Sequence, residues 1–134
     1  MRYKNQAKEK NNGVVYTPPA MATYIANEIV AGYKFDDCSI IKVLDPALGE
    51  GELTIAVVSA IKAIHPDKKI SVHGYDIDSL SVEKSRSRIE EVFPDVEVNF
   101  MVRDFLSIEP TENRYDIVIS NPPYIRTQIL GEDV

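Results

Sequence analysis

Two short motifs in this sequence combine residue types that could do chemistry. One is Asn121-Pro122-Pro123-Tyr124, which follows a β-type apolar run. Each proline fixes its own φ, lacks an N–H and favours extended geometry in the residue before it. The motif therefore predicts a stiff loop whose carbonyl acceptors lie beside a flat ring. Such a loop could hold a planar group that carries an –NH2, as adenine, cytosine and a glutamine side-chain amide do.

The second motif is Asp45-Pro46-Ala47-Leu48-Gly49-Glu50-Gly51, where a predicted strand turns into a predicted helix. It departs from the dinucleotide-binding pattern G-x-G-x-x-G, because Thr54 stands at the third glycine position. Glu50 and Glu52 occupy the start of the helix. Acidic side chains there disfavour a pyrophosphate and suit a ligand that bears positive charge.

Asp76 follows the next predicted strand and lies 25 residues beyond Gly51. That separation is near the one expected for an acidic group that binds ribose hydroxyls. A nucleoside with a cationic tail satisfies both the acidic loop and the ribose position. S-adenosylmethionine is such a molecule, since it carries a sulfonium and an ammonium.

Alternating strand and helix patterns position these motifs. Strands are predicted at Ile40–Leu44, Ile70–Tyr75, Val96–Val102 and Tyr115–Ser120, and helices at Leu53–Ile64 and from Ser79 to about Val92. The second of these helices is expected to bury Leu80, Val82, Ile89 and Val92. An earlier helix is expected after an N-cap at Thr17, with Met21, Tyr24, Ile25 and Ile29 on one face and Gly32 as its stop. Such a succession gives right-handed crossovers and a parallel sheet, with ligands bound at the carboxyl ends of its strands.

The two motifs together resemble those of the amino-methyltransferase family. Gly13–Pro19, ahead of the glycine motif, resembles the segment that opens the gamma-class N6-adenine DNA methyltransferases of restriction–modification systems. The resemblance implies an α/β, Rossmann-like, S-adenosylmethionine-dependent methyltransferase fold, with a partial parallel sheet of order 3-2-1-4 and helices on both faces. It also implies transfer of a methyl group from S-adenosylmethionine to the N6 amine of adenine in DNA.

The resemblance further implies a role for each matching residue. Cofactor binding would fall to Tyr16, Thr17, Pro18, Asp45, Ala47, Gly49, Gly51, Asp76, Ile77, Asp104 and Phe105. Catalysis would fall to Asn121, Pro122 and Tyr124. The side-chain oxygen of Asn121 and the carbonyl of Pro122 would accept the hydrogens of the target amine, and Tyr124 would stack on a base flipped out of the duplex. No metal is expected, because neither histidine has partner ligands at useful spacing.

Composition places the chain in a cytoplasmic setting. No apolar run approaches the roughly 20 residues of a membrane span, no secretory signal is visible, and Cys38 is the only cysteine. Residues 1–12 are expected to form a flexible basic tail of net charge +3, whereas the whole chain of 134 residues carries −6. The remainder, at −9, is a poor non-specific binder of DNA, so the basic surface for DNA is expected elsewhere.

The family resemblance covers residues 13–134, which we expect to be the N-terminal part of a catalytic domain truncated after Asn121-Pro122-Pro123-Tyr124. Such a fragment would bind cofactor without methylating DNA on its own. DNA, and a restriction or specificity subunit, would be its partners through regions outside it, and an exposed edge of the fourth strand could pair two copies. The alternatives are a methyltransferase of protein glutamine or of RNA, a non-catalytic cofactor-binding fragment, and a dinucleotide-dependent oxidoreductase.

Overall fold

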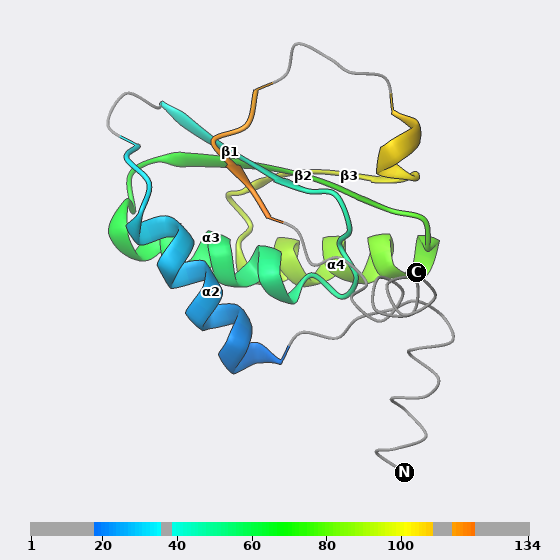
Figure 1. Cartoon of the computed structure of the whole chain (residues 1–134), viewed down its shortest axis with the longest axis horizontal. Coiled ribbons are helices and arrows are strands. Elements are labelled where there is room, and N and C mark those ends of the chain that lie inside the picture. The colour runs from blue at the N-terminus through cyan, green and yellow to red at the C-terminus, as the bar shows by residue number, and fades with distance from the viewer. Residues whose placement is uncertain (1–17, 36–38, 109–113, 120–134) are drawn as a thin grey trace, which may run out of the picture.

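A four-stranded parallel sheet organises the molecule (Figure 1). The computed structural model describes residues 18–35, 39–108 and 114–119. The strands are β1 (Ile40–Asp45), β2 (Lys69–Asp76), β3 (Glu97–Val102) and β4 (Ile117–Val118), in the order β3-β2-β1-β4. The predicted parallel sheet and its strand order are confirmed.

Three α-helices lie on one side of this sheet: α2 (Pro19–Ala31), α3 (Glu52–Ile64) and α4 (Ser79–Val92) (Figure 1). The chain steps from β1 to β2 to β3 in one direction, so two right-handed crossovers bring α3 and α4 to the same face. Helices were expected on both faces. Within the described residues the α-helices cover one face only, and the connection back to β4 contributes η1 (Phe105–Ser107), a single 3-10 turn.

Alternation along the strands explains the core. Every second side chain faces the helices and is buried, as in Ile41 and Val43 of β1, Ile70 and Val72 of β2, and Phe100 of β3. The side chains between them face the other way and include polar residues such as Lys42, His73 and Asn99. Because all four strands are parallel, their carboxyl ends share one edge of the sheet, and the described α-helices form one layer beneath it.

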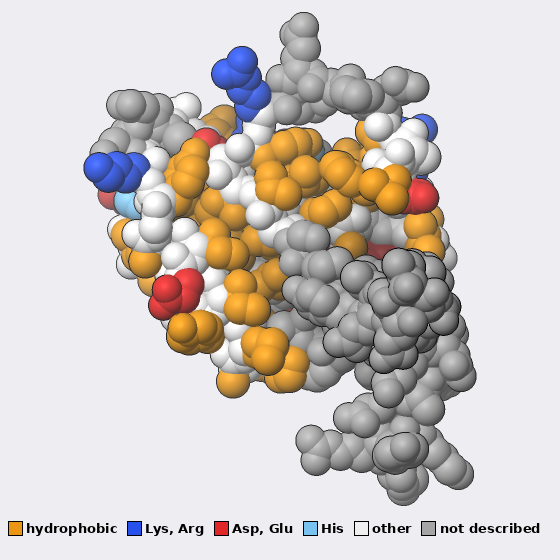
Figure 2. Space-filling view, in the orientation of Figure 1, with side chains coloured by type: hydrophobic (Ala, Val, Ile, Leu, Met, Phe, Trp, Pro, Cys, Tyr) orange, Lys and Arg blue, Asp and Glu red, His pale blue; other side chains and the backbone are white. Residues whose placement is uncertain are grey.

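The buried face of α2 differs from the apolar face that the sequence indicates. Its buried residues are Ala22, Ala26 and Val30. Of the predicted face, Ile25 and Ile29 are partly buried against the core, whereas Met21 and Tyr24 are 55% and 66% exposed. Small side chains let α2 pack closely on α3, and this close contact outweighs the burial of two larger residues. Figure 2 shows the hydrophobic side chains that this packing leaves on the surface of α2.

The start of α2 differs from the prediction, whereas its predicted stop at Gly32 is confirmed. Pro18 is its N-cap and Pro19 its first residue, while the expected cap, Thr17, lies outside the described residues. Gly32 ends the helix as a C-cap in right-handed backbone geometry. No helix in the described ranges is both long enough and apolar enough to cross a membrane.

In α4, Val82 and Ile89 are buried as expected, but Leu80 and Val92 are exposed and the buried face includes the polar Ser85. Asp78 caps this helix, since its carboxylate accepts the N–H of Leu80 at 3.2 Å. The polar residue on the buried face points toward the loop that follows β1, which leads to the site.

Candidate cofactor site

Three strand ends are tied together at the carboxyl edge of the sheet. After β1, the N–H of Leu48 donates to the carbonyl of Tyr75 at 2.9 Å, and the N–H of Gly49 donates to the carboxylate of Asp76 at 2.9 Å. On the other side of β2, the N–H of Arg103 donates to the carbonyl of Asp76 at 2.8 Å. Asp76 therefore connects the loop after β1 with the loop after β3.

Asp45 anchors the glycine loop from inside the protein. It is only 2% exposed, and its carboxylate accepts the hydroxyl of Thr54 at 2.5 Å and the N–H of Ala47 at 3.1 Å. Burial raises the pKa of this carboxyl to about 6. The two hydrogen bonds oppose that rise in pKa, and the charge of Asp76 adds to it. The carboxyl thus fixes the loop to α3 and titrates close to neutral pH.

Asp76 keeps unused acceptor capacity. One of its carboxylate oxygens accepts the N–H of Gly49 and the other accepts the N–H of Asp78, both at 2.9 Å. Each carboxylate oxygen can accept two hydrogen bonds, so one position per oxygen is left for a ligand. Two acceptor oxygens held side by side suit a vicinal diol such as that of a ribose. Among the described residues, no group of three His, Cys, Asp or Glu side chains could hold a metal ion.

The two glycines of the loop adopt backbone geometry that other residues avoid. Gly49 and Gly51 have φ values of +55° and +81°. A Cβ atom added to Gly51 would lie 3.2 Å from the side chain of Ser85, whereas one added to Gly49 would meet nothing within 4 Å. Gly49 is thus constrained by conformation alone, and Gly51 by conformation and by the approach of α4.

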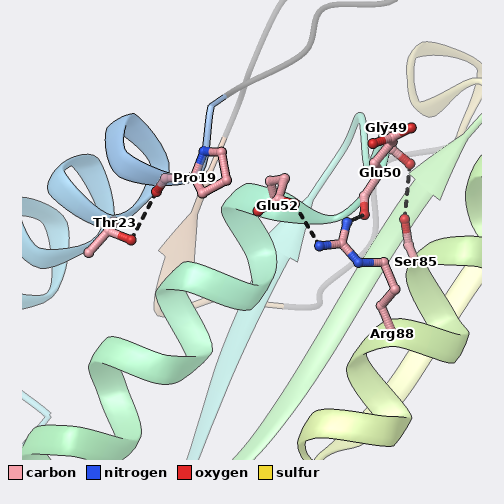
Figure 3. Close-up of polar contacts among 7 residues, drawn as sticks. All are labelled: Pro19, Thr23, Gly49, Glu50, Glu52, Ser85 and Arg88. Atoms are coloured by element: carbon pink, nitrogen blue, oxygen red, sulfur yellow. Dashed lines mark hydrogen bonds and ion pairs between the residues drawn. The ribbon is translucent and has the colours of Figure 1, made fainter.

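Ser85 and Arg88 of α4 hold the loop from the helical side (Figure 3). The hydroxyl of Ser85 donates to the carbonyl of Gly49 at 3.0 Å, and the guanidinium of Arg88 donates to the carbonyl of Glu50. The same guanidinium pairs with the carboxylate of Glu52 at 2.6 Å. The charge of Glu52, expected to attract a cationic ligand, is therefore compensated within the protein.

Three further predicted residues, Ile77, Asp104 and Phe105, follow the ends of β2 and β3. Ile77 is 74% exposed, and the ring of Phe105 lies 5.6 Å from the ring of Tyr75. Asp104 caps η1, because its carboxylate accepts the N–H of Leu106 at 3.0 Å. These side chains offer apolar surface and one acidic group in the loops that follow β2 and β3, and an adenine ring could use both.

The family model for N-6 DNA methylases matches residues 1–133. The chain belongs to this family. It is 36% identical over 123 residues to the type II methyltransferase M.VspI of Vibrio sp. (strain 343), a match that covers 91% of this chain and 26% of that protein. The chain thus spans about a quarter of the length of M.VspI.

Solved structures with the same fold lie further away in sequence. The type IIG restriction endonuclease BpuSI superimposes with a TM-score of 0.61 at 23% identity, over 82% of this chain and 13% of that one. A protein from Burkholderia thailandensis bound to S-adenosyl-homocysteine superimposes with a TM-score of 0.55 at 15% identity, over 83% of this chain and 28% of that one. The Rossmann-like methyltransferase fold expected from the motifs is thereby confirmed.

The residues expected to be functional in this N-6 DNA methylase family member fall into two groups. The structure brings together Asp45, Ala47, Gly49, Gly51 and Asp76, with Ile77, Asp104 and Phe105 near them in the loops after β2 and β3. Pro18 is exposed at the start of α2. The others, Tyr16, Thr17, Asn121, Pro122 and Tyr124, lie outside the described residues.

Sequence reasoning missed three residues that shape this site. Thr54 was noted only as a missing glycine, yet it is fully buried and donates to Asp45. A hydroxyl one helical turn beyond a glycine loop, with an aspartate before that loop, would have been a usable signal. Ser85 and Arg88 gave none, because they lie in a mostly polar helix more than 30 residues beyond the loop they contact.

Proposed function

We propose that this chain carries the S-adenosylmethionine-binding part of a DNA methyltransferase that acts on the N6 amine of adenine. The observation that carries the proposal is the position of Asp76. Its carboxylate accepts the backbone N–H groups of Gly49 and Asp78, and its backbone carbonyl accepts the N–H of Arg103 in the loop after β3. The family match supports the reaction class. The two acceptor oxygens of Asp76 suit the vicinal hydroxyls of a ribose and so support a nucleoside ligand.

Each part of the site has a separate task in this proposal. Asp76 holds the ribose hydroxyls, and the exposed Ile77 with Phe105 forms apolar contacts with the adenine of the cofactor. Asp45 holds the loop in place rather than meeting the ligand, because its side chain is buried and its carboxylate joins the loop to Thr54 of α3. When bound, S-adenosylmethionine supplies an electrophilic methyl group.

For the methyl acceptor, we propose the roles predicted from the sequence. Asn121 and Pro122 accept the two hydrogens of the target amine and so localise its lone pair on nitrogen, while Tyr124 stacks on the base. These three residues lie outside the described ranges and remain predictions. The family match favours adenine in DNA over protein glutamine or RNA.

The proposed partners follow from the same assignment. DNA is the substrate, and a restriction or specificity subunit is a further partner. An acidic chain of net charge −6 requires basic surface from elsewhere in such an assembly.

Pairing of two copies through the β4 edge remains a prediction. In the described part of the chain, β4 pairs with β1 on one side and forms an edge of the sheet on the other.

The experiment that tests the cofactor assignment is a calorimetric titration of the whole chain with S-adenosylhomocysteine. We expect saturable binding by the wild type and a loss of at least about tenfold in affinity for Asp76→Ala, because the ribose hydroxyls lose a charged acceptor. The matched control is Asp95→Ala, since Asp95 is an exposed carboxylate whose described partner is Lys62.

The two variants separate the outcomes. Equal weakening in both would mean that the loss reflects general destabilisation and not the ribose position. Unchanged affinity in Asp76→Ala would remove Asp76 from the site. Absence of binding by a folded wild-type chain at millimolar ligand would overturn the proposal that this part of the protein holds the cofactor.

A further inference from the structure

The glycine loop is held from two sides by different kinds of group. From the sheet side, the carboxylates of Asp45 and Asp76 accept backbone N–H groups of Ala47 and Gly49. From the helical side, Ser85 and Arg88 donate to the carbonyls of Gly49 and Glu50. Acceptors on one side and donors on the other fix the orientation of successive peptide planes in the loop.

Ser85 and Arg88 can act together because of their spacing. They lie three residues apart on α4, so their side chains project from one face of the helix toward the loop (Figure 3). Ser85 is fully buried, and its side chain lies where a Cβ atom on Gly51 would come within 3.2 Å. The helix therefore contacts the loop directly, and a Ser85 hydroxyl turned elsewhere would leave the carbonyl of Gly49 without this donor.

Arg88 is itself held in place. Its guanidinium pairs with the carboxylate of Glu52, which is 19% exposed in its side chain, while it donates to the carbonyl of Glu50. A guanidinium has several donors in a fixed plane, so one group can bind both partners at once. Arg88 thereby joins α4 to the loop and to the first residue of α3.

The orientation of one peptide has a consequence for ligands. In a trans peptide the carbonyl of one residue and the N–H of the next point in opposite directions. With the carbonyl of Gly49 directed at Ser85, the N–H of Glu50 points away from α4, and none of the described residues accepts from it. Within the described part of the chain, this N–H is therefore a donor left for an anionic or hydroxyl group of a bound molecule.

We propose that Ser85 and Arg88 are positioning residues for the cofactor site: they hold the glycine loop from α4 so that the N–H of Glu50 stays directed at the ligand. This inference deepens the proposed function and rests on it. Neither residue touches the ligand in this scheme. Both act through the loop backbone, and the ligand chemistry that benefits is the carboxylate or a hydroxyl of an S-adenosyl compound.

The test combines amide hydrogen exchange without ligand and calorimetry with S-adenosylhomocysteine, both on the whole chain. In Arg88→Ala we expect the amides of Gly49 and Gly51 to exchange about tenfold faster and the ligand to bind about tenfold more weakly. The reason is that this substitution removes a charge-assisted hydrogen bond from the loop. Ser85→Ala, which removes only one oxygen from the packed interface, should change both quantities in the same direction.

The matched control is Arg86→Ala. Arg86 lies on the same helix and donates to the carbonyl of Phe100 in β3 at 2.6 Å, so its loss removes a similar contact from a different place. It should leave the exchange of the two glycine amides unchanged. Equal acceleration in Arg86→Ala and Arg88→Ala would overturn the inference, because the effect would then belong to α4 as a whole.

Two further variants sharpen the result. Arg88→Lys should recover part of the affinity, since lysine can still donate to one carbonyl but not to two partners in one plane. Glu52→Gln should weaken binding less than Arg88→Ala does, because it keeps an acceptor for Arg88 and removes only charge. Unchanged exchange in both Ser85→Ala and Arg88→Ala would overturn the positioning role. That result would hold whether or not the wild type binds the ligand, so it is distinct from a failure of the proposed function.

Discussion

At the scale of single residues, the pKa of Asp45 depends strongly on the surrounding protein. Its carboxyl is buried, receives two hydrogen bonds and has its pKa raised to about 6 from an ordinary value of 3.8. In the unfolded chain the group releases its proton near pH 3.8, whereas the folded chain retains it up to about pH 6. Folding therefore binds a proton in this interval, and stability falls as the pH rises through it.

This linkage gives a prediction for Asp45→Asn. The contribution of Asp45 to the free energy of unfolding should be fully present below pH 3.8 and should decline by about 3 kcal/mol as the pH rises through 6. Urea denaturation of the wild type and of Asp45→Asn across this range measures it, because the difference between the two curves isolates the one group. Parallel curves would contradict the raised pKa.

A second prediction concerns the hydroxyl of Thr54. Thr54→Val should lower the free energy of unfolding at pH 8 by about 1–3 kcal/mol, because the buried carboxylate loses a donor that favours its charged form. Thr54→Ser keeps the hydroxyl and should lose less. Denaturant titration of the two variants compares them. A larger loss in the serine variant would mean that the methyl group, and not the hydrogen bond, stabilises this position.

At the scale of elements, the sequence predicted topology better than packing. The strand order follows from right-handed crossovers between strands that the apolar runs mark clearly, so few alternatives existed. The buried faces of α2 and α4 depend on which neighbour each helix meets. Ala22 and Ala26 are buried because α3 approaches them closely, and Leu80 is exposed because no described element covers it.

The residues of the candidate site likewise divide into those that the sequence predicted and those that it did not. Asp45, Gly49 and Asp76 were predictable because each stands next to a strand end, where the fold places ligands. Arg88 was not, because its partners are more than 30 residues away and nothing in a polar helix marks which arginine turns inward. Local motifs report the loop, while the support behind it depends on tertiary contacts.

The contact between the glycine loop and α4 predicts different costs for two alanine substitutions. Gly49→Ala should destabilise by about 1–2 kcal/mol, the cost of left-handed backbone for a residue with a Cβ atom. Gly51→Ala should cost more, since its Cβ atom would also press on Ser85. Thermal or urea denaturation gives both values. Equal costs would indicate that α4 moves aside freely.

The Gly51→Ala cost can be traced to its cause with a double variant. Combining Gly51→Ala with Ser85→Gly removes the side chain that the new methyl group would meet, so part of the loss should return. The same change at Ser85 combined with Gly49→Ala should bring no recovery, because nothing lies within 4 Å of that position.

At the scale of the whole molecule, the site joins elements that the sheet alone leaves separate. The loops after β1, β2 and β3 are connected through Asp76, and α4 is connected to the first of them. A ligand that contacts these loops should therefore stabilise the folded chain as a unit and not one loop alone.

The prediction is a stability that depends on ligand concentration. S-adenosylhomocysteine at about 100 times its dissociation constant should raise the free energy of unfolding by about 2.7 kcal/mol, with a matching rise in Tm. Differential scanning calorimetry at increasing ligand concentration measures it. The rise should shrink in Asp76→Ala at the same ligand concentration and persist in Asp95→Ala. A Tm that ignores the ligand would contradict binding to the folded state.

The pairing of β4 with β1 also bears on how the chain emerges from the ribosome. Residues through Val102 contain β1, β2, β3 and both crossover helices, so they can assemble from neighbouring units as they are synthesised. The second edge of β1 must wait for a partner 74 residues away, when the backbone N–H of Lys42 meets the carboxylate of Asp116. Until that segment has left the exit tunnel, a nascent chain displays an open strand from what will become the middle of its sheet. This interval is when a chaperone, or a neighbouring nascent chain, has the best access to it.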